Sequence, residues 1–202
     1  MKLIVMTKTT FFVEEDKILS TLFEEGMDNL HLYKPNSEPI YSERLLTLIP
    51  DDYYKRISVH EHFYLREEYG LKGIHLEMPN DQPPTGYRGK VSRTCNSLDQ
   101  LAAAKKLSTY VFLKSIFNSQ SNPADKQSFT MQQLEQASRQ GLIDKRVYAL
   151  GGVNLGNIKQ LAGLGFGGVV VCGDLWNHFD IHNGQDYNEL IAHFKKLQKA
   201  TS

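Results

Sequence analysis

Cysteine, surplus charge and long hydrophobic runs are all scarce in this sequence. Its two cysteines, Cys95 and Cys172, lie far apart, and neither has a second cysteine or a histidine at metal-ligand spacing. The sequence therefore predicts neither a disulfide framework nor a zinc site. Lys plus Arg and Asp plus Glu both number 23, and no basic stripe recurs along the chain, which argues against a nucleic-acid partner.

No segment approaches the roughly 18 apolar residues of a membrane span, and the apolar stretch 3–6 is too short for the core of a signal peptide. We therefore expect a cytoplasmic protein with no membrane partner. The chain has 202 residues, 41% of them hydrophobic, which suffices for one domain with a substantial core and is marginal for two. We predict a single domain over residues 1–202.

Short apolar segments of strand length alternate with longer amphipathic segments. The candidate strands are residues 2–6, 29–33, 57–60, 73–76, 89–94, 110–114, 147–150 and 168–172. Helical patterns occupy 13–25, 97–107, 130–140 and 157–164, with weaker patterns at 37–49 and 60–70. Between Glu77 and Lys90 the Pro, Gly and Asp residues predict a loop. Eight such units predict an α/β TIM (β/α)8 barrel, a closed ring of parallel strands inside a ring of helices. An open doubly wound sheet is the alternative, although no G-x-G-x-x-G follows the first strand, as a dinucleotide fold would require.

Two helix starts carry recognisable capping residues. Ser97 precedes a helical pattern and Gln100 follows three residues later, which is typical of a capping box. Asn154 is the candidate cap of the helix that carries Ile158 and Leu161.

Glycines follow the last two candidate strands. Gly151 and Gly152 come directly after the seventh strand, and Gly173 follows the eighth, where a short helix could begin at Asp174. In barrels of this class a phosphate group commonly binds the backbone N–H groups of these two loops. The glycines therefore predict a phosphate site, although each one alone could also be a structural turn or bulge.

Several segments carry a resemblance to one family. Residues 148–176, YALGGVNLGNIKQLAGLGFGGVVVCGDLW, resemble the carboxy-terminal signature of the thiamine phosphate synthase/TenI family. Residues 69–77, 92–104 and 110–123 resemble its fourth, fifth and sixth strand regions, so the resemblance spans nearly the whole chain. It implies coupling of a pyrimidine methyl pyrophosphate to a thiazole phosphate, with release of pyrophosphate and assistance from Mg²⁺.

The positions that handle charge in the family differ here. Tyr33 and Pro35 stand where the resemblance places an arginine and a lysine that meet pyrophosphate, and a tyrosine cannot replace a guanidinium fork. Glu61 stands at a magnesium-binding aspartate and could still ligate a hard cation. Asn80 aligns with the second such aspartate, and Asp81 lies beside it.

The polar positions after the fifth and sixth strands are partly kept. Thr94 retains the hydroxyl of a family serine, whereas Asn96 replaces the histidine of the TenI branch and cannot shuttle a proton at neutral pH. Ser119 and Ser121 keep two hydroxyls of the next loop. The lysine that follows them in the family is missing, and Lys126 could substitute for it.

The candidate site follows from these comparisons and from strand geometry. Alternation places His31 and Tyr33 on one face of their strand, where Tyr33 could stack on a heterocycle. The trio His60, Glu61 and His62 cannot all meet one ion, because adjacent strand residues point to opposite sides. The predicted catalytic residues are Thr94, Ser119, Ser121 and Lys126; the predicted substrate-binding residues are His31, Tyr33, His60, Asn96, Gly151, Gly152, Gly173 and Asp174; the predicted Mg²⁺ ligands are Glu61, Asn80 and Asp81.

Three functions remain open from the sequence. The first is a thiamine phosphate synthase acting on small phosphorylated heterocycles, with self-association into a homo-oligomer left open. The second is a TenI-like protein that binds thiazole phosphate or thiamine phosphate without joining substrates, which the changes at the charge-handling positions motivate. The third is a sugar-phosphate isomerase or lyase with Glu77 or His31 as its base.

Overall fold

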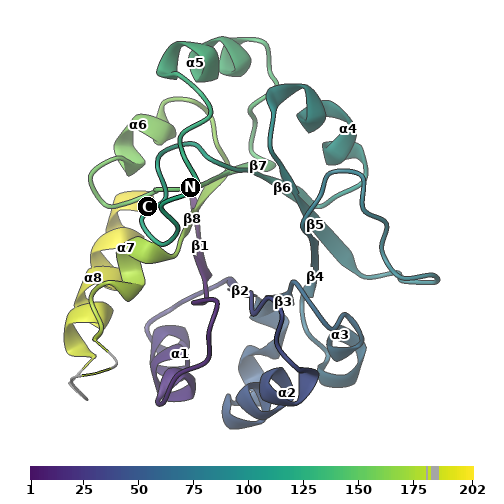
Figure 1. Cartoon of the computed structure of the whole chain (residues 1–202). Helices are drawn as coiled ribbons and strands as arrows, with labels where there is room; N and C mark the ends of the chain where they lie inside the picture. The colour runs from purple at the N-terminus through teal and green to yellow at the C-terminus, as the bar shows by residue number, and fades with distance from the viewer. Residues whose placement is uncertain (181, 183–186) are drawn as a thin grey trace.

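A closed barrel of eight parallel strands forms the centre of the molecule (Figure 1). The computed structural model describes residues 1–180, 182 and 187–202. Each strand pairs with the next along the chain, and β8 pairs with β1 to close the ring. The strands are β1 (Lys2–Met6), β2 (Leu30–Leu32), β3 (Ile57–Val59), β4 (Gly73–Leu76), β5 (Lys90–Cys95), β6 (Tyr110–Leu113), β7 (Val147–Leu150) and β8 (Gly168–Val171). The predicted TIM barrel is confirmed, and the open sheet is excluded.

Helices surround the barrel in the described part of the chain (Figure 1). They are α1 (Glu15–Glu24), α2 (Pro39–Leu48), α3 (Tyr64–Tyr69), α4 (Leu101–Lys106), α5 (Met131–Arg139), α6 (Ile158–Ala162), α7 (Gly173–Trp176) and α8 (Asn188–Thr201), with 3-10 turns η1 (Asp51–Arg56) and η2 (Leu98–Gln100). The whole of 77–89 is described and contains no helix, as its Pro, Gly and Asp residues predicted. None of the described helices is long and apolar enough to span a bilayer.

The helix starts explain where two of the crossovers turn. The capping box of Ser97 and Gln100 is present as predicted. The prediction that Asn154 caps α6 is wrong by one turn, because Asn157 precedes the first residue of that helix. The Asn154 side chain instead accepts hydrogen bonds from the N–H groups of Gly156 (2.9 Å) and Asn157 (3.1 Å), which fixes the turn that leads into α6.

The apolar core lies between the strands and the helices, and a second, smaller group of side chains fills the barrel. This inner group is Ile4, Met6, Tyr110, Phe112, Tyr148 and Val170. Buried polar side chains, including His31 and His75, occupy the β2–β5 side of the same interior. The inside of the barrel is therefore packed, with one apolar and aromatic side and one hydrogen-bonded side.

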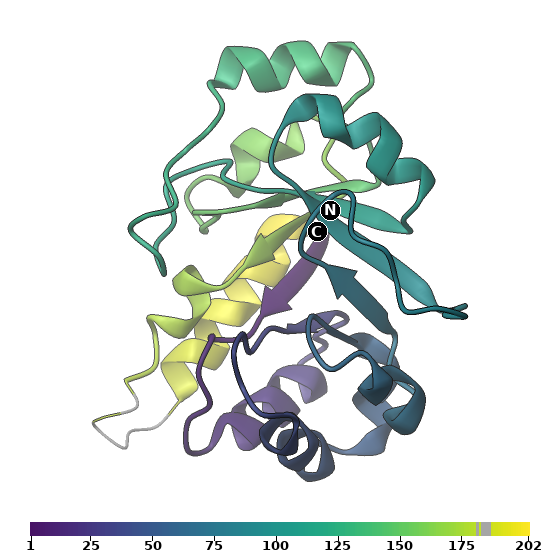
Figure 2. The same ribbon diagram turned by 45° about the vertical axis from the view of Figure 1, so that its right-hand side comes forward.

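The two ends of the chain meet. Helix α8 lies along β1, and the amino group of Met1 donates a hydrogen bond to the carbonyl oxygen of Thr201 at 2.7 Å (Figure 2). The last helix thereby covers the seam at which β1 and β8 close the barrel.

Candidate functional site

A cavity of about 470 Å³ opens at the carboxyl ends of the strands, the end of such barrels at which active sites are built. It is lined by residues that follow most of the strands, from Thr7 after β1 to Asp174 after β8. The predicted site residues in this lining are Tyr33, His60, Thr94, Ser119, Ser121, Gly151, Gly152, Gly173 and Asp174. The predicted residues outside the lining are His31, Glu61, Asn80, Asp81, Asn96 and Lys126.

The glycine pair after β7 adopts a backbone that favours glycine. Gly151 and Gly152 have φ angles of 103° and 63°, in the left-handed region. A Cβ atom on Gly152 would lie 2.2 Å from the carbonyl oxygen of Asn118, and one on Gly151 would lie 2.9 Å from the amide nitrogen of Ser115. The glycines are therefore needed where the loop after β6 crosses the end of β7, which supports their structural role.

The same loops also present unused amide groups to the cavity. Within the described residues, no acceptor is bonded to the N–H groups of Gly152, Gly173 or Asp174. Gly173 opens α7 as predicted. Backbone N–H groups that lack a partner are strong donors for an oxyanion, so a structural and an anion-binding role coexist in these loops.

Two lysines that were not among the predicted site residues line the cavity. Lys8, in the loop after β1, and Lys114, the first residue after β6, both line it. Lys114 Nζ lies 3.3 Å from a carboxylate oxygen of Asp125 in the same loop. Lys114 could have been predicted as a site residue, because it directly follows a candidate strand. Lys126 is exposed outside the cavity, which leaves Lys114 as the lysine of this loop in the site.

The hydroxyls of the loop after β6 lie close to one another. The Ser119 hydroxyl accepts a hydrogen bond from the amide of Asn122 at 3.0 Å and lies 3.4 Å from the Ser121 hydroxyl. Asn96 is exposed, and its amide donates to the Gln100 side chain at 2.8 Å, so it belongs to the start of α4.

Lys34, between the two changed positions of the β2 segment, points away from the cavity. Its ammonium is buried and donates to Glu15 Oε1 at 2.6 Å and to the carbonyl oxygen of Thr10 at 2.8 Å, above the ring of Phe11. Burial raises the pKa of Glu15 and lowers that of Lys34, while the attraction within the pair acts against both shifts. This lysine ties the loop after β1 to β2 and is not available to a substrate.

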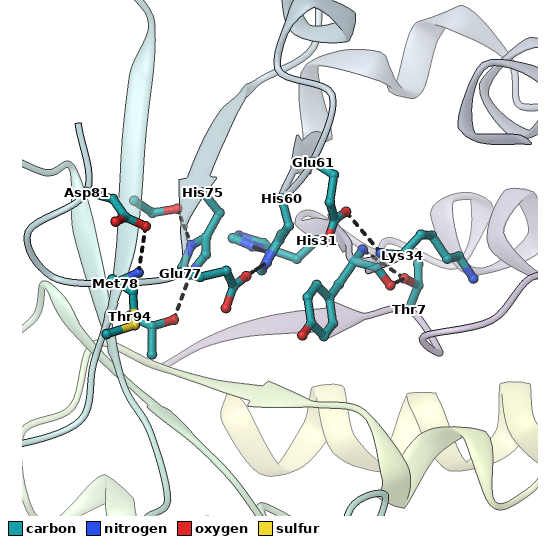
Figure 3. Close-up of polar contacts among 12 residues, drawn as sticks. Thr7, His31, Lys34, His60, Glu61, His75, Glu77, Met78, Asp81 and Thr94 are labelled. Atoms are coloured by element: carbon teal, nitrogen blue, oxygen red, sulfur yellow. Dashed lines mark hydrogen bonds and ion pairs between the residues drawn. The ribbon is translucent and has the colours of Figure 1, made fainter. Parts of the chain in front are cut away.

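Three histidines on β2, on β4 and at the end of β3 lie together inside the barrel, and His31 and His60 among them are hydrogen-bonded to each other (Figure 3). His31 Nε2 lies 2.7 Å from the Tyr110 hydroxyl, and His31 Nδ1 lies 2.8 Å from His60 Nε2. His60 Nδ1 is bonded in turn to the carboxylate of Glu77, which faces the cavity. A continuous chain of polar contacts thus runs from the barrel interior to the site.

The direction of this chain follows from the acceptor at its end. Burial lowers the pKa of His31 well below its ordinary value, and the neighbouring His60 and Lys72 lower it further, so this imidazole is neutral and donates from only one nitrogen. A carboxylate can only accept, which assigns the proton of His60 to Nδ1. When His60 is neutral, its Nε2 accepts, so that His31 donates from Nδ1 and the hydroxyl of Tyr110 donates to His31 Nε2.

The histidines do not fit a metal ion. Nitrogen atoms of His31, His60 and His75 lie within 4.8 Å of one another. However, the rings of His60 and His75 are stacked, with centroids 4.2 Å apart and planes 23° apart, so their in-plane lone pairs do not converge on one point. Both nitrogens of His75 are also bonded, to the hydroxyls of Ser92 and Thr94, each at 2.8 Å.

The predicted metal ligands do not come together. Glu61 accepts a hydrogen bond from the amide of Lys34 at 3.1 Å, whereas Asp81 accepts one from the amide of Met78 at 3.2 Å. Figure 3 shows the two carboxylates on opposite sides of the histidines. The carbonyl oxygens of Pro79 and Asp81 accept hydrogen bonds from Arg93 at 2.7 and 3.0 Å, which holds their loop against β5.

A different set of carboxylates gathers near Tyr33. Burial raises the pKa of its phenol, and the charges of Glu77, Glu61 and Asp125 raise it further. Burial likewise raises the pKa of Glu61, while the hydrogen bond from the Lys34 amide and the charge of His60 act against this shift and the charge of Glu77 adds to it. Carboxylate oxygens are the ligands that a hard divalent cation prefers, and of the three carboxylates near Tyr33, Glu77 and Asp125 line the cavity.

Comparisons with known proteins agree with this architecture. The family model described as thiamine monophosphate synthase matches residues 43–175. A crystal structure of thiamine phosphate pyrophosphorylase from Bacteroides thetaiotaomicron is 50% identical, with a TM-score of 0.89 over 99% of this chain and 97% of that one. Thiamine phosphate pyrophosphorylase from Pyrococcus furiosus is 18% identical, with a TM-score of 0.74 over 98% of this chain and 94% of that one, and it shares the fold. No curated protein is significantly similar to the chain.

Proposed function

Because the chain belongs to the thiamine monophosphate synthase family, we propose that it joins a pyrimidine methyl pyrophosphate to a thiazole phosphate. The observation that carries this proposal is the composition of the cavity. Unpaired amides of the loops after β7 and β8 share it with the ammonium groups of Lys8 and Lys114. A site of this kind suits two substrates that both carry phosphate groups.

The reaction needs compensation of charge more than acid–base catalysis. The bond between the pyrimidine methylene carbon and the pyrophosphate oxygen breaks, and its electron pair leaves with the pyrophosphate. The ring nitrogen of the thiazole then donates an electron pair and forms the new C–N bond. Preorganised donors and cations around the departing oxyanion stabilise the transition state most effectively.

The residues of the cavity divide between the two substrates. The amides of Gly152, Gly173 and Asp174 would hold the thiazole phosphate, and Gly151 shapes the same loop. The hydroxyls of Ser119 and Ser121 and the ammonium groups of Lys8 and Lys114 would hold the pyrophosphate. These assignments rest on the loops from which the groups approach.

The heterocycles would lie against the opposite wall. Tyr33, His60 and Thr94 face the cavity there. His31 acts through its bond to His60 and is a positioning residue. Asn96 and Lys126 have no contact role in this proposal.

Magnesium fits the carboxylates around Tyr33. We propose that Glu61 and Glu77 hold it, in place of Asn80 and Asp81, because both carboxylates act on the same phenol of Tyr33 and Glu77 faces the cavity. When bound, the ion would offset the negative charge of the pyrophosphate.

The synthase is favoured over a binding protein of the TenI type by the 50% identity to a thiamine phosphate pyrophosphorylase across nearly the whole chain. A cytoplasmic location and self-association remain proposals from the sequence.

Coupled turnover tests the function directly. The protein is incubated with the pyrimidine pyrophosphate, thiazole phosphate and Mg²⁺, and thiamine phosphate is detected by oxidation to fluorescent thiochrome. We expect product that depends on both substrates. Calorimetric binding of thiazole phosphate by folded protein that forms no thiamine phosphate would refute the synthase and support the binding protein.

A further inference from the structure

A second cavity, of about 240 Å³, lies at the amino-terminal mouth of the barrel. All strands run parallel, so their first residues meet at this end, opposite the candidate site. The cationic residues in its lining stand at or just before strand starts: Lys2, Lys72, Lys90, Lys145 and Arg146. No carboxylate belongs to the lining that the structure describes.

In the described part of the chain, the cations of this mouth lack the ion-pair partners that the protein gives its buried lysines; Lys72 is partly buried and the other four are exposed. Lys34 is paired with Glu15 at 2.6 Å and Lys105 with Asp144 at 2.8 Å. By contrast, none of the five basic residues of this cavity forms an ion pair within residues 1–180, 182 and 187–202. Positive charge is therefore concentrated at this mouth, with only the longer-range attraction of Asp28 and Asp144 to offset it.

Lys72 shows the effect of this crowding. Burial, followed by the charges of Lys2 and Lys90, lowers its pKa to about 8, against a smaller opposing effect of Asp28. The other nearby carboxylate, Asp144, is already bonded to Lys105 and to the amide of Arg146. A bound anion would relieve this repulsion, because an opposite charge favours the protonated amine.

The floor of the cavity is polar and partly unsatisfied. The hydroxyl of Tyr110 lies there, with hydrogen-bonding side chains of Asn29, Ser58 and Ser92 around it. Asn29 is 5% exposed, and its side-chain oxygen has no hydrogen-bond partner among the described residues. The unmet atom is an acceptor, so it does not add to the attraction for an anion, which comes from the basic side chains of the rim.

We propose that this amino-terminal cavity binds a small phosphate-group anion, at a site separate from the one that the family defines. The basic side chains supply positive charge around the rim of a polar recess. A recess with a closed polar floor suits a small ligand rather than an extended polyanion.

Isothermal calorimetry with sodium pyrophosphate, in EDTA and at constant ionic strength, tests the proposal. The variant Lys72→Gln/Lys90→Gln removes two charges from the rim, whereas Lys159→Gln removes an exposed charge on α6 as a matched control. We expect the double variant to bind pyrophosphate at this mouth roughly tenfold or more weakly, as the loss of charge-assisted bonds predicts. The control should bind as the unaltered protein does.

A fluorescence titration separates the two cavities, because Trp176 lines the carboxyl-terminal one and is the only tryptophan of the chain. The double variant should leave this signal and the synthase activity unchanged and should not lower the melting temperature, since it relieves repulsion. The proposal is overturned if the double variant binds as tightly as the unaltered protein, or if Lys159→Gln weakens binding equally.

Orthophosphate and pyrophosphate are compared in the same experiment. Tighter binding of pyrophosphate would identify a diphosphate ligand, and tighter binding of orthophosphate would identify a monophosphate. Absence of binding of either anion to the unaltered protein outside the Trp176 site would refute the assignment.

Discussion

Replacement of Lys34 by methionine would leave Glu15 buried without its cation. The two atoms of the pair are 2.6 Å apart, and both side chains are almost fully buried. Methionine keeps most of the volume, so the main cost is electrostatic. Breaking a buried pair by removing one partner costs about 3–5 kcal/mol of stability.

The pKa of Glu15 sets an independent limit to this cost. The buried carboxylate can take up a proton and so lose its unpaired charge. Protonation costs about 1.36 kcal/mol of stability for each pH unit by which the pH exceeds the unfolded-state pKa of about 4.3. The limit is therefore about 3.7 kcal/mol at pH 7 and about 1 kcal/mol at pH 5. A carboxyl group with a raised pKa in the folded state binds more protons when folded, so the stability of the variant falls as the pH rises through this window.

Urea unfolding of Lys34→Met and of the unaltered protein, followed by the fluorescence of Trp176 and by circular dichroism, measures the difference at each pH. The matched control is Glu15→Gln/Lys34→Met, which carries no buried charge and should recover most of the loss at pH 7. Two results would contradict this account: a loss of stability that is the same at pH 5 and pH 7, or a double variant that is as unstable as Lys34→Met alone. Either would show that Lys34 does not stabilise the fold through its ion pair with Glu15.

The remaining predictions concern the proposed chemistry. Glu77→Gln should raise the Mg²⁺ concentration needed for half-maximal synthase activity, because it removes one of the two proposed ligand carboxylates; an unchanged metal titration would assign Glu77 to the histidines alone. Lys114→Met should raise the KM for the pyrimidine pyrophosphate about tenfold, the value of a lost charge-assisted hydrogen bond, and should leave calorimetric binding of thiazole phosphate unaltered. Equal weakening of both ligands would place Lys114 elsewhere in the mechanism.

The architecture could be predicted from the sequence because it depends on local signals. Strands that are buried on both faces are short apolar runs, and each of the eight predicted runs became a strand with ends within one or two residues. The 77–89 loop was predicted for the same reason, since proline and glycine disfavour a helix there. Only the turn before α6 was misplaced, because Asn154 and Asn157 are both good capping residues.

The site was less predictable because it depends on where side chains point. The sequence placed Lys34 beside a substrate position, yet alternation along β2 turns it toward Glu15. Lys8 and Glu77 stand in no motif of charged residues, and only the closed barrel brings them to the same cavity. Asn80 and Asp81 matched a family position, but their loop is bound to Arg93 and lies outside the lining.

The histidine group inside the barrel constrains how this protein can change. Each ring depends on the donor or acceptor state of its neighbour, from Tyr110 through His31 and His60 to Glu77. A substitution at one of these positions leaves its neighbour without the donor or acceptor that it needs, because a buried polar group requires a partner. These positions are therefore expected to diverge as a block between related sequences, since intermediates with a single exchange carry a mismatched contact in the middle of the fold.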